Sequence, residues 1–256
     1  MQILELVQGS PEWHAVRAKH FCASEAAAMM GVSPYTTRNE LLRQKATGDT
    51  PDVDPMKQRI FDKGHEAEKL ARPIVEVILG DDLFPATGRR TVEGLPMLAS
   101  FDGLTMAGEE AWENKLLNAE LAARIRANEV PATHWPQLEH QSIVSRAKRI
   151  YFTVSDGTEE NTIGTWYESV PERRAQVIAG WKQFHIDLAN YKHVEAAPVP
   201  VAAHIEALPT LMVHVEGRVV AMTRLRSANA SSLLRGVMAF RFNGRYRQTA
   251  HRIVLV

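Results

Sequence analysis

Cysteine is almost absent from this sequence, because Cys22 is the single one among 256 residues. No internal disulfide can form, which favours a reducing compartment such as the cytoplasm. The ten histidines do not suggest a zinc site: His134 and His140 lie close together, but Cys22 is far from both. The N-terminus has neither a basic nor an apolar segment, and no apolar run approaches membrane-spanning length. We therefore predict neither a signal peptide nor a membrane span.

An excess of charge of one sign is also absent, with 30 basic and 30 acidic residues. The balance hides an asymmetry, because residues 222–256 contain seven arginines and no acid. Residues 1–221 therefore carry 23 basic against 30 acidic side chains. A net-acidic body does not suggest a protein that coats nucleic acid non-specifically. It leaves room for a local basic groove, and for carboxylates that hold cations.

Hydrophobic periodicity and turn residues predict an α/β domain over residues 1–194, with a mixed central sheet flanked by helices. Ser24 is expected to cap the first helix. The predicted helices are 25–30, 36–46, 56–79, 119–128, 135–146 and 171–191. The predicted strands are 83–85, 89–93, 98–105, 110–116, 149–155 and 162–168. The apolar stripe of the longest helix is expected to consist of Ala67, Leu70, Ile74, Val77 and Ile78.

A second region is predicted after this domain. Residues 195–210 are rich in alanine and proline and read as a linker to a C-terminal appendage of Arg-rich composition, 211–256. A hairpin is expected around Glu216-Gly217. The apolar residues beyond it are expected to form one helix: Leu233, Leu234, Val237, Met238 and Phe240.

The strongest chemical signal is Asp102, followed by Glu113-x-Lys115 on what the pattern predicts to be the next strand. Two carboxylates can hold a hard divalent cation, and a lysine beside them can handle a proton. Alternation places Glu113 and Lys115 on one face of their strand. By itself, an acidic pair near a turn more often lies at a solvated edge, so the assignment depends on its context.

Further motifs supply that context, and together they resemble the YqaJ-type phage recombination nucleases, the relatives of lambda exonuclease. The matching segments are Trp13…Arg17, Ala23-Ser24-Glu25, Gly31…Tyr35, Gly64-x-x-x-Glu68, Ser100-Phe-Asp102, Glu113-x-Lys115 and Trp135-Pro-Gln137…Gln141. They occur in the same order as in that family and span about residues 8–190. The resemblance implies a PD-(D/E)xK, restriction-endonuclease-like core.

The resemblance also implies an activity and its partners. The activity is a Mg²⁺-dependent exonuclease, with Mn²⁺ as a substitute, that degrades double-stranded DNA processively from 5′ to 3′ and leaves 3′ single strands. The implied partners are DNA ends, a single-strand annealing recombinase and two further copies in a homotrimer. No membrane is involved, and the implied location is the cytoplasm of a bacterial host, for a phage-encoded or bacterial protein.

Residue roles follow from the same resemblance. Asp102 would bridge two metals, Glu113 and the Asn114 carbonyl would bind the first, and Glu68 would complete the second. Lys115 would orient or deprotonate the attacking water, and Gln137 would position it. The residues implied to contact DNA are Arg17, Ser24, Ser100 and Arg124.

Several alternatives stay open at this point. The helical phase favours Glu66 over Glu68 as the residue nearer the apolar stripe, and Glu68 can form a surface ion pair with Arg72. Gln137 and Gln141 can equally well face solvent. The family's basic residue after the lysine is missing, and Arg124 and Arg126 on the next predicted helix are the alternative substitutes for it. An endonuclease or nickase, or a catalytically silent DNA-binding module, would fit the same fold.

Overall fold

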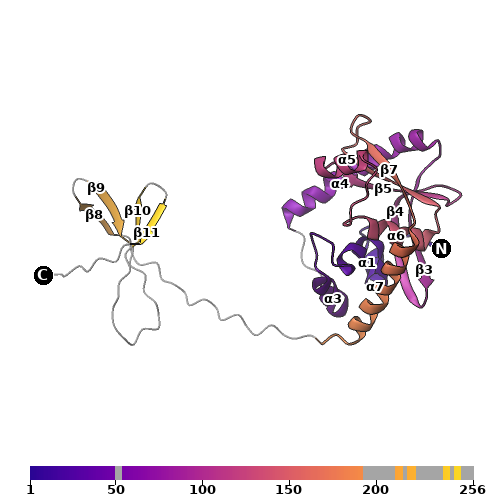
Figure 1. Ribbon diagram of the computed structural model, residues 1–256, viewed down its shortest axis with the longest axis horizontal. Helices are drawn as coiled ribbons and strands as arrows, with labels where there is room; N and C mark the ends of the chain where they lie inside the picture. The colour runs from indigo at the N-terminus through magenta and orange to yellow at the C-terminus, as the bar shows by residue number, and fades with distance from the viewer. Residues whose placement is uncertain (50–53, 193–210, 216–217, 223–238, 243–244, 249–256) are drawn as a thin grey trace. The chain divides into compact units, whose positions relative to one another are not determined.

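The computed structural model describes residues 1–49 and 54–192 in full and, beyond them, the backbone of four strands (Figure 1). The chain divides into two compact units, residues 1–193 and 194–256. Among the residues described, no helix has the length and apolar character needed to cross a membrane.

The first unit alternates helices and strands along the chain. Its helices are α1 (Pro11–Ala18), η1 (Ala23–Glu25), α2 (Ala26–Met29), α3 (Arg38–Thr47), α4 (Pro55–Leu79), α5 (Ala119–Arg126), α6 (Trp135–Ser145) and α7 (Pro171–Ala189). Its strands are β1 (Gln2–Leu4), β2 (Phe21–Cys22), β3 (Phe84–Val92), β4 (Leu95–Leu104), β5 (Glu110–Leu116), β6 (Arg149–Ser155) and β7 (Ile163–Glu168).

One sheet organises this unit, with the strand order β1-β3-β4-β5-β6-β7 and β2 added beside β4. The β5–β6 and β2–β4 pairs are parallel, and the other pairs are antiparallel. The prediction of an α/β fold with a mixed central sheet is confirmed. The parallel β5–β6 pair is possible because α5 and α6 connect the two strands.

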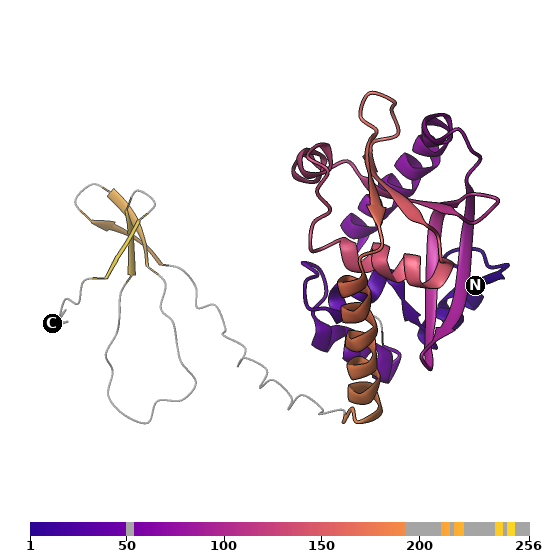
Figure 2. The ribbon, with the colours of Figure 1, turned by 45° about the vertical axis from the view of Figure 1, so that its right-hand side comes forward.

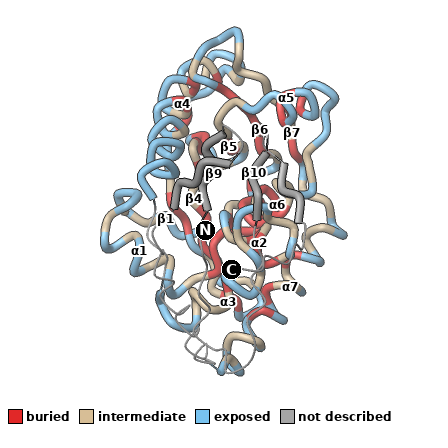
Figure 3. The backbone as a smooth tube through the Cα atoms, turned by 90° about the vertical axis from the view of Figure 1, so that its left-hand side faces the viewer, coloured by how far each residue is buried: buried red, intermediate tan, exposed pale blue. Residues whose placement is uncertain are grey.

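Helices cover the sheet from several directions (Figure 2). The main core contains residues of α2, α5, α6 and α7 with one face of the strands, and its largest members include Trp181, Phe152 and Phe184. A smaller core joins α4 to Trp112 of β5. Figure 3 shows the contrast between the buried strands and the exposed outer side of α4. These two cores therefore hold the sheet, including β4 and β5, against the helices.

The long helix packs differently from the prediction. Its buried residues are Ala67, Ala71 and Val75, at a spacing of four, whereas the predicted Leu70, Val77 and Ile78 are exposed. The stripe was wrong because α4 contacts the sheet through small side chains, which allow a close approach, and leaves larger apolar ones outside. With this phase, Glu68 lies beside the buried side and Glu66 is exposed.

Two local predictions near the N-terminus were also wrong. Helix α1 was not predicted, although Ser10 caps it by accepting a hydrogen bond from the Trp13 N–H at 3.1 Å. It buries no residue fully, so its apolar pattern is weak. Ser24 does not cap a helix, because it lies inside η1, where Cys22 holds the capping position.

A third difference concerns β3, which the sequence divides into two strands at Gly88. The strand is continuous, and Gly88 lies inside it because the Met1 side chain packs where a Cβ would stand. The glycine marks a close approach rather than a turn.

The second unit contains two antiparallel hairpins. Strands β8 (Leu211–Val215) and β9 (Arg218–Met222) pair around positions 216–217, which confirms the predicted hairpin. Strands β10 (Ala239–Phe242) and β11 (Arg245–Gln248) form the other. Phe240 therefore belongs to a strand and not to the predicted helix, whose other members lie outside the described residues. The predicted linker, 195–210, lies outside them as well.

Candidate active site

The candidate site lies beside β4, at the place where this strand changes partner. β2 pairs with β4 at Met97 and Leu98, and β5 pairs with it at Gly103 and Leu104. β2 and β5 both lie at the edge of β4 opposite β3. At this edge, residues 99–102 have no strand partner in the part of the chain that the structure describes. The backbone groups of this stretch that point away from β3 are therefore available to other groups.

Side chains complete the hydrogen bonds that strands leave unmade there. Gln141 of α6 donates from Nε2 to the Ser100 carbonyl at 2.9 Å. The Asn114 N–H donates to Asp102 Oδ2 at 2.7 Å, so a carboxylate takes the place of a backbone carbonyl. The pairing of β4 with β5 covers Gly103 and Leu104 and does not include Asp102. The gap between β2 and β5 thus becomes a polar recess at the edge of the core.

Glu113 is the centre of this recess and is only 4% exposed. Its Oε1 lies 2.5 Å from Lys115 Nζ and accepts from Gln137 Nε2 at 2.6 Å. Its Oε2 accepts from Gln141 Nε2 at 2.6 Å. Lys115 also donates to Gln137 Oε1 at 3.1 Å. Charge-assisted bonds of this kind fix the orientation of the carboxylate.

The opposite face of β5 is used for packing. Trp112 donates from Nε1 to Thr153 Oγ1 at 2.8 Å, and Thr153 donates to Asn114 Oδ1 at 2.8 Å. Glu113 and Lys115 therefore share one face, as the alternation predicts, while the Asn114 side chain is occupied on the other. Only the Asn114 backbone remains available to the site.

The electrostatics of the recess favour positive charge. Burial, together with the carboxylates of Glu113 and Glu68, raises the pKa of Asp102 well above its usual range. Burial lowers the pKa of Lys115, but the charges of Glu113 and Asp102 and the bond to Glu113 more than offset this, so its pKa lies above the ordinary value. The lysine is thus held as an ammonium in the metal-free protein.

Helix α4 brings Glu68 to the same recess. Burial, with the neighbouring Glu113, raises the pKa of Glu68, although the Arg72 guanidinium acts in the opposite direction. Arg72 pairs with Glu68 Oε1 at 3.0 Å and donates from Nε to the Asp102 carbonyl at 3.3 Å. The two interpretations of Glu68 are therefore compatible: it forms the ion pair, and it lies near both site carboxylates. Glu66 faces solvent instead.

A cleft of about 760 Å³ extends from the recess. It is lined by Asp102, Glu113, Gln137 and Ser100, and also by Trp13, Arg17 and Ser24 of the N-terminal segment. Arg17 donates from Nη2 to Ser24 Oγ at 3.2 Å, and its guanidinium lies 4.5 Å from the Trp13 ring centroid. Residues separated by about 80 positions in the sequence thus share one cavity.

Arg124 is placed elsewhere. It lines a separate hollow with Trp166 and Arg173, and it lies 3.8 Å from the carboxylates of both Glu120 and Glu129. Its proposed contact with DNA therefore belongs to a different surface from the cleft.

The donor chemistry suits a hard divalent cation. Asp102, Glu113 and the Asn114 carbonyl offer oxygen atoms only, and a cation would relieve the repulsion that raises the pKa of Asp102. Within residues 1–49 and 54–192, no three His, Cys, Asp or Glu side chains are arranged to hold a metal as they stand. To become the third carboxylate ligand, Glu68 would have to give up its ion pair with Arg72 and bind the cation instead.

Sequence reasoning missed parts of this arrangement. Gln141 is fully buried and bonded to both β4 and Glu113, so it does not face solvent. The signal was its spacing of four from Gln137, which places both amides on one side of α6. Arg72 was considered only as a partner of Glu68, and nothing in the sequence indicates its bond to the Asp102 backbone.

The comparisons with known proteins bear on the fold and on the family of this chain. An alkaline exonuclease from Laribacter hongkongensis has 21% sequence identity and a TM-score of 0.58, covering 71% of this chain and 93% of its own. The same exonuclease in complex with dAMP matches with 20% identity, the same coverage and a TM-score of 0.58. No curated protein matches the chain. These likenesses establish a shared fold.

The family comparison reaches further. The YqaJ-like viral recombinase domain matches residues 12–148, more than half of the chain. The matched stretch begins in α1, beside Trp13, contains the whole Asp102–Lys115 region, and ends just after α6. This chain therefore belongs to the family of YqaJ-like viral recombinase domains, the nuclease family that its motifs resemble.

Proposed function

We propose that this protein is a metal-dependent exodeoxyribonuclease that degrades double-stranded DNA from its ends. The observation that carries the proposal is one cleft that is lined both by Asp102 and Glu113 and by the Arg17–Ser24 pair. Lys115 contacts the Glu113 carboxylate of this cleft. A nuclease that acts at ends needs a cutting site and a site for the terminal phosphate within reach of each other. Family membership and the exonuclease fold support the same assignment.

The residues of the recess have distinct roles in this reaction. Asp102, Glu113, the Asn114 carbonyl and Glu68 would hold Mg²⁺, with Mn²⁺ as a substitute. Such ions activate water, neutralise the charge that develops on the phosphate and stabilise the leaving oxygen. Lys115, held by Glu113 and Gln137, orients the attacking water and shuttles its proton. Gln137 and Gln141 keep the Glu113 carboxylate in place.

The polarity of digestion would come from the second part of the cleft. Arg17 can bind a 5′-phosphate through its guanidinium, with the Ser24 hydroxyl beside it. A strand whose 5′ end is held there presents a nearby phosphodiester to the recess, which gives processive 5′→3′ digestion and leaves a 3′ single strand. A homotrimer, an annealing recombinase as partner and a cytoplasmic location complete the proposal by analogy with the family.

Digestion of end-labelled DNA tests this function. Linear duplexes with a 5′-phosphate, linear duplexes with a 5′-hydroxyl and covalently closed circles are incubated with the full chain in Mg²⁺. We expect release of nucleotides from the labelled 5′ strand, faster from phosphorylated ends, and no cutting of circles. Cleavage of closed circles would indicate an endonuclease on the same fold. Binding without cleavage in either metal would indicate a silent DNA-binding module.

A further inference from the structure

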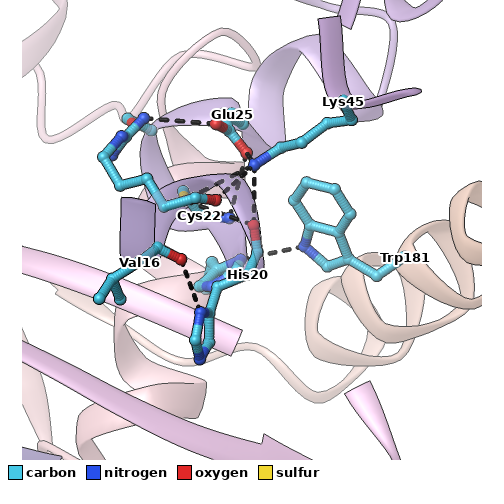
Figure 4. Close-up of polar contacts among 9 residues, drawn as sticks. Val16, His20, Cys22, Glu25, Lys45 and Trp181 are labelled. Carbon is cyan, nitrogen blue, oxygen red and sulfur yellow. Dashed lines mark hydrogen bonds and ion pairs between the residues drawn. The ribbon is translucent and has the colours of Figure 1, made fainter. Parts of the chain in front are cut away.

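Lys45, a largely buried lysine, lines the same cleft as Arg17 and has no role in the proposed reaction. Lys45 of α3 is 8% exposed, and its Nζ donates to the Arg17 carbonyl at 2.9 Å and to the His20 carbonyl at 2.8 Å. The same Nζ lies 2.8 Å from Glu25 Oε2 (Figure 4). An ammonium has three N–H donors. All three are therefore used within the protein, and none is left for a ligand.

Glu25 is shared between Lys45 and Arg17. Its Oε2 accepts from Lys45 and from the Cys22 N–H at 3.2 Å. Its Oε1 lies 3.3 Å from Arg17 Nη2, which is a longer contact than the one to Lys45. The Arg17 side chain is 22% exposed and that of Lys45 8%. Glu25 thus forms its closer and more buried ion pair with the lysine.

Arg17 keeps unused capacity on the side of the cleft. Its bonds to Ser24 and Glu25 both use Nη2. Within the described residues, its Nε and Nη1 groups have no protein acceptor. The Trp13 ring covers one face of the guanidinium. Ser24, Glu25 and Trp13 therefore hold the guanidinium in place, and its Nε–H and Nη1–H groups can bind an oxyanion.

The charges of the three side chains decide whether such an anion binds. Lys45 and Arg17 carry two positive charges and Glu25 one negative charge, so the group has a net charge of +1. Without the lysine charge, Glu25 and Arg17 would cancel each other. An anion would then have to compete with Glu25 for the guanidinium, in a partly buried place where such competition is strong.

We propose that Lys45 is a positioning residue that sets the affinity of the Arg17 pocket for a terminal phosphate. It does so without touching the phosphate, by neutralising Glu25 and so leaving Arg17 its charge. The inference rests on the proposed function, in which Arg17 binds the 5′-phosphate of DNA. It adds a determinant of end preference that lies outside the cutting site.

A charge-exchange series in the full chain tests the proposal. The variants are Lys45→Gln, Glu25→Gln and the double variant. Two measurements are made on each: the rise in melting temperature caused by inorganic phosphate, and the ratio of cleavage rates for 5′-phosphate and 5′-hydroxyl ends. We expect Lys45→Gln to reduce that ratio by about tenfold and to lose the phosphate effect. The double variant, whose net charge is again +1, should recover most of both.

The recovery in the double variant distinguishes an electrostatic role from a merely structural one. Replacing Glu25 restores the net charge but does not restore the hydrogen bonds from Lys45 to the Arg17 and His20 carbonyls. Glu25→Gln alone, with a net charge of +2, should bind phosphate more tightly than the wild type, and it tests the proposal even if Lys45→Gln does not fold. The matched control is the exposed pair Lys182–Glu93, 2.7 Å apart, in which the same exchanges should change neither measurement.

The outcomes separate this inference from the proposed function. If Arg17→Ala abolishes the phosphate effect but Lys45→Gln retains it, or if the double variant is no better than Lys45→Gln, the role of Lys45 is refuted while the pocket stands. If Arg17→Ala leaves both measurements unchanged, the phosphate pocket lies elsewhere and both proposals for this part of the cleft fail.

Discussion

Replacing Asp102 by asparagine is expected to stabilise the metal-free protein while it abolishes cleavage. Asp102 lies beside the carboxylates of Glu113 and Glu68, and the nearby cations are Lys115 and Arg72. The group therefore holds three negative and two positive charges. An asparagine at this position removes the unbalanced charge and can still accept the hydrogen bond from the Asn114 N–H.

The magnitude follows from the burial of the site. Relief of an unbalanced buried charge is worth on the order of 1–3 kcal/mol, within the range measured when buried ionic groups are replaced. For a unit of this size, that corresponds to a rise in melting temperature of roughly 2–12 °C. The sign depends on pH: because the pKa of Asp102 is higher in the folded than in the unfolded state, the wild type loses stability as the pH rises above about 3.8. The gain from asparagine should therefore be present at pH 8 and absent at pH 3.

Thermal unfolding in a chelator, repeated with increasing Mg²⁺, measures both effects. Mg²⁺ should raise the melting temperature of the wild type much more than that of Asp102→Asn. The control is Asp62→Asn, since Asp62 is exposed on α4 and accepts a hydrogen bond from the exposed Gln58. A variant that melts below the wild type in chelator would refute the repulsion argument. Equal stabilisation of both proteins by Mg²⁺ would remove Asp102 from the metal ligands.

Four further outcomes are expected. Lys115→Ala should lose about 10²–10⁴-fold in turnover, measured by single-turnover digestion, and still bind duplex ends in Ca²⁺; near-normal cleavage would contradict its role. Gln141→Leu removes the donor that Glu113 Oε2 and the Ser100 carbonyl share, so urea unfolding should show a loss of about 1–3 kcal/mol with reduced cleavage. An unchanged protein would be inconsistent with these two bonds. A chain ending at Tyr191 should fold and cut DNA, because α7 is the last helix of the first unit. A loss of DNA affinity together with a flatter salt dependence in this truncated chain would assign phosphate contacts to the Arg-rich region. Burial lowers the pKa of His140 to about 3, so the folded protein favours the neutral ring. The protein should therefore lose stability as the pH falls from 6.5 towards 3, and acid unfolding curves should show a smaller loss for His140→Gln.

Local patterns were sufficient for much of this structure. β5 and β6 begin and end at the predicted residues, because alternation and the flanking turns define both strands. The placement of Glu113 and Lys115 on one face followed from the same alternation. The α4 boundaries were also close, since Asp54 caps one end and Gly80 adopts a left-handed conformation at the other.

Long-range pairing was beyond those patterns. The gap beside residues 99–102 exists because two residues of β2 pair with β4 across a sequence separation of more than 70 residues. A two-residue strand has no periodicity to detect. The phase of α4 was misjudged for a related reason: its contact with the sheet depends on small residues such as Ala71, which carry little hydrophobic signal. The choice of Glu68 over Glu66 therefore came from the motif and not from the helix.

The hydrogen bond from the Asn114 amide to the Asp102 carboxylate makes one backbone proton a reporter of the site's chemical state. Its N–H donates at 2.7 Å to an oxygen whose charge changes with protonation and with cation binding. In a proton–nitrogen spectrum, this resonance should lie far downfield and move when Mg²⁺ or acid is added, before any DNA is present. Cation binding in the recess can thus be followed through the Asn114 N–H resonance in the absence of substrate.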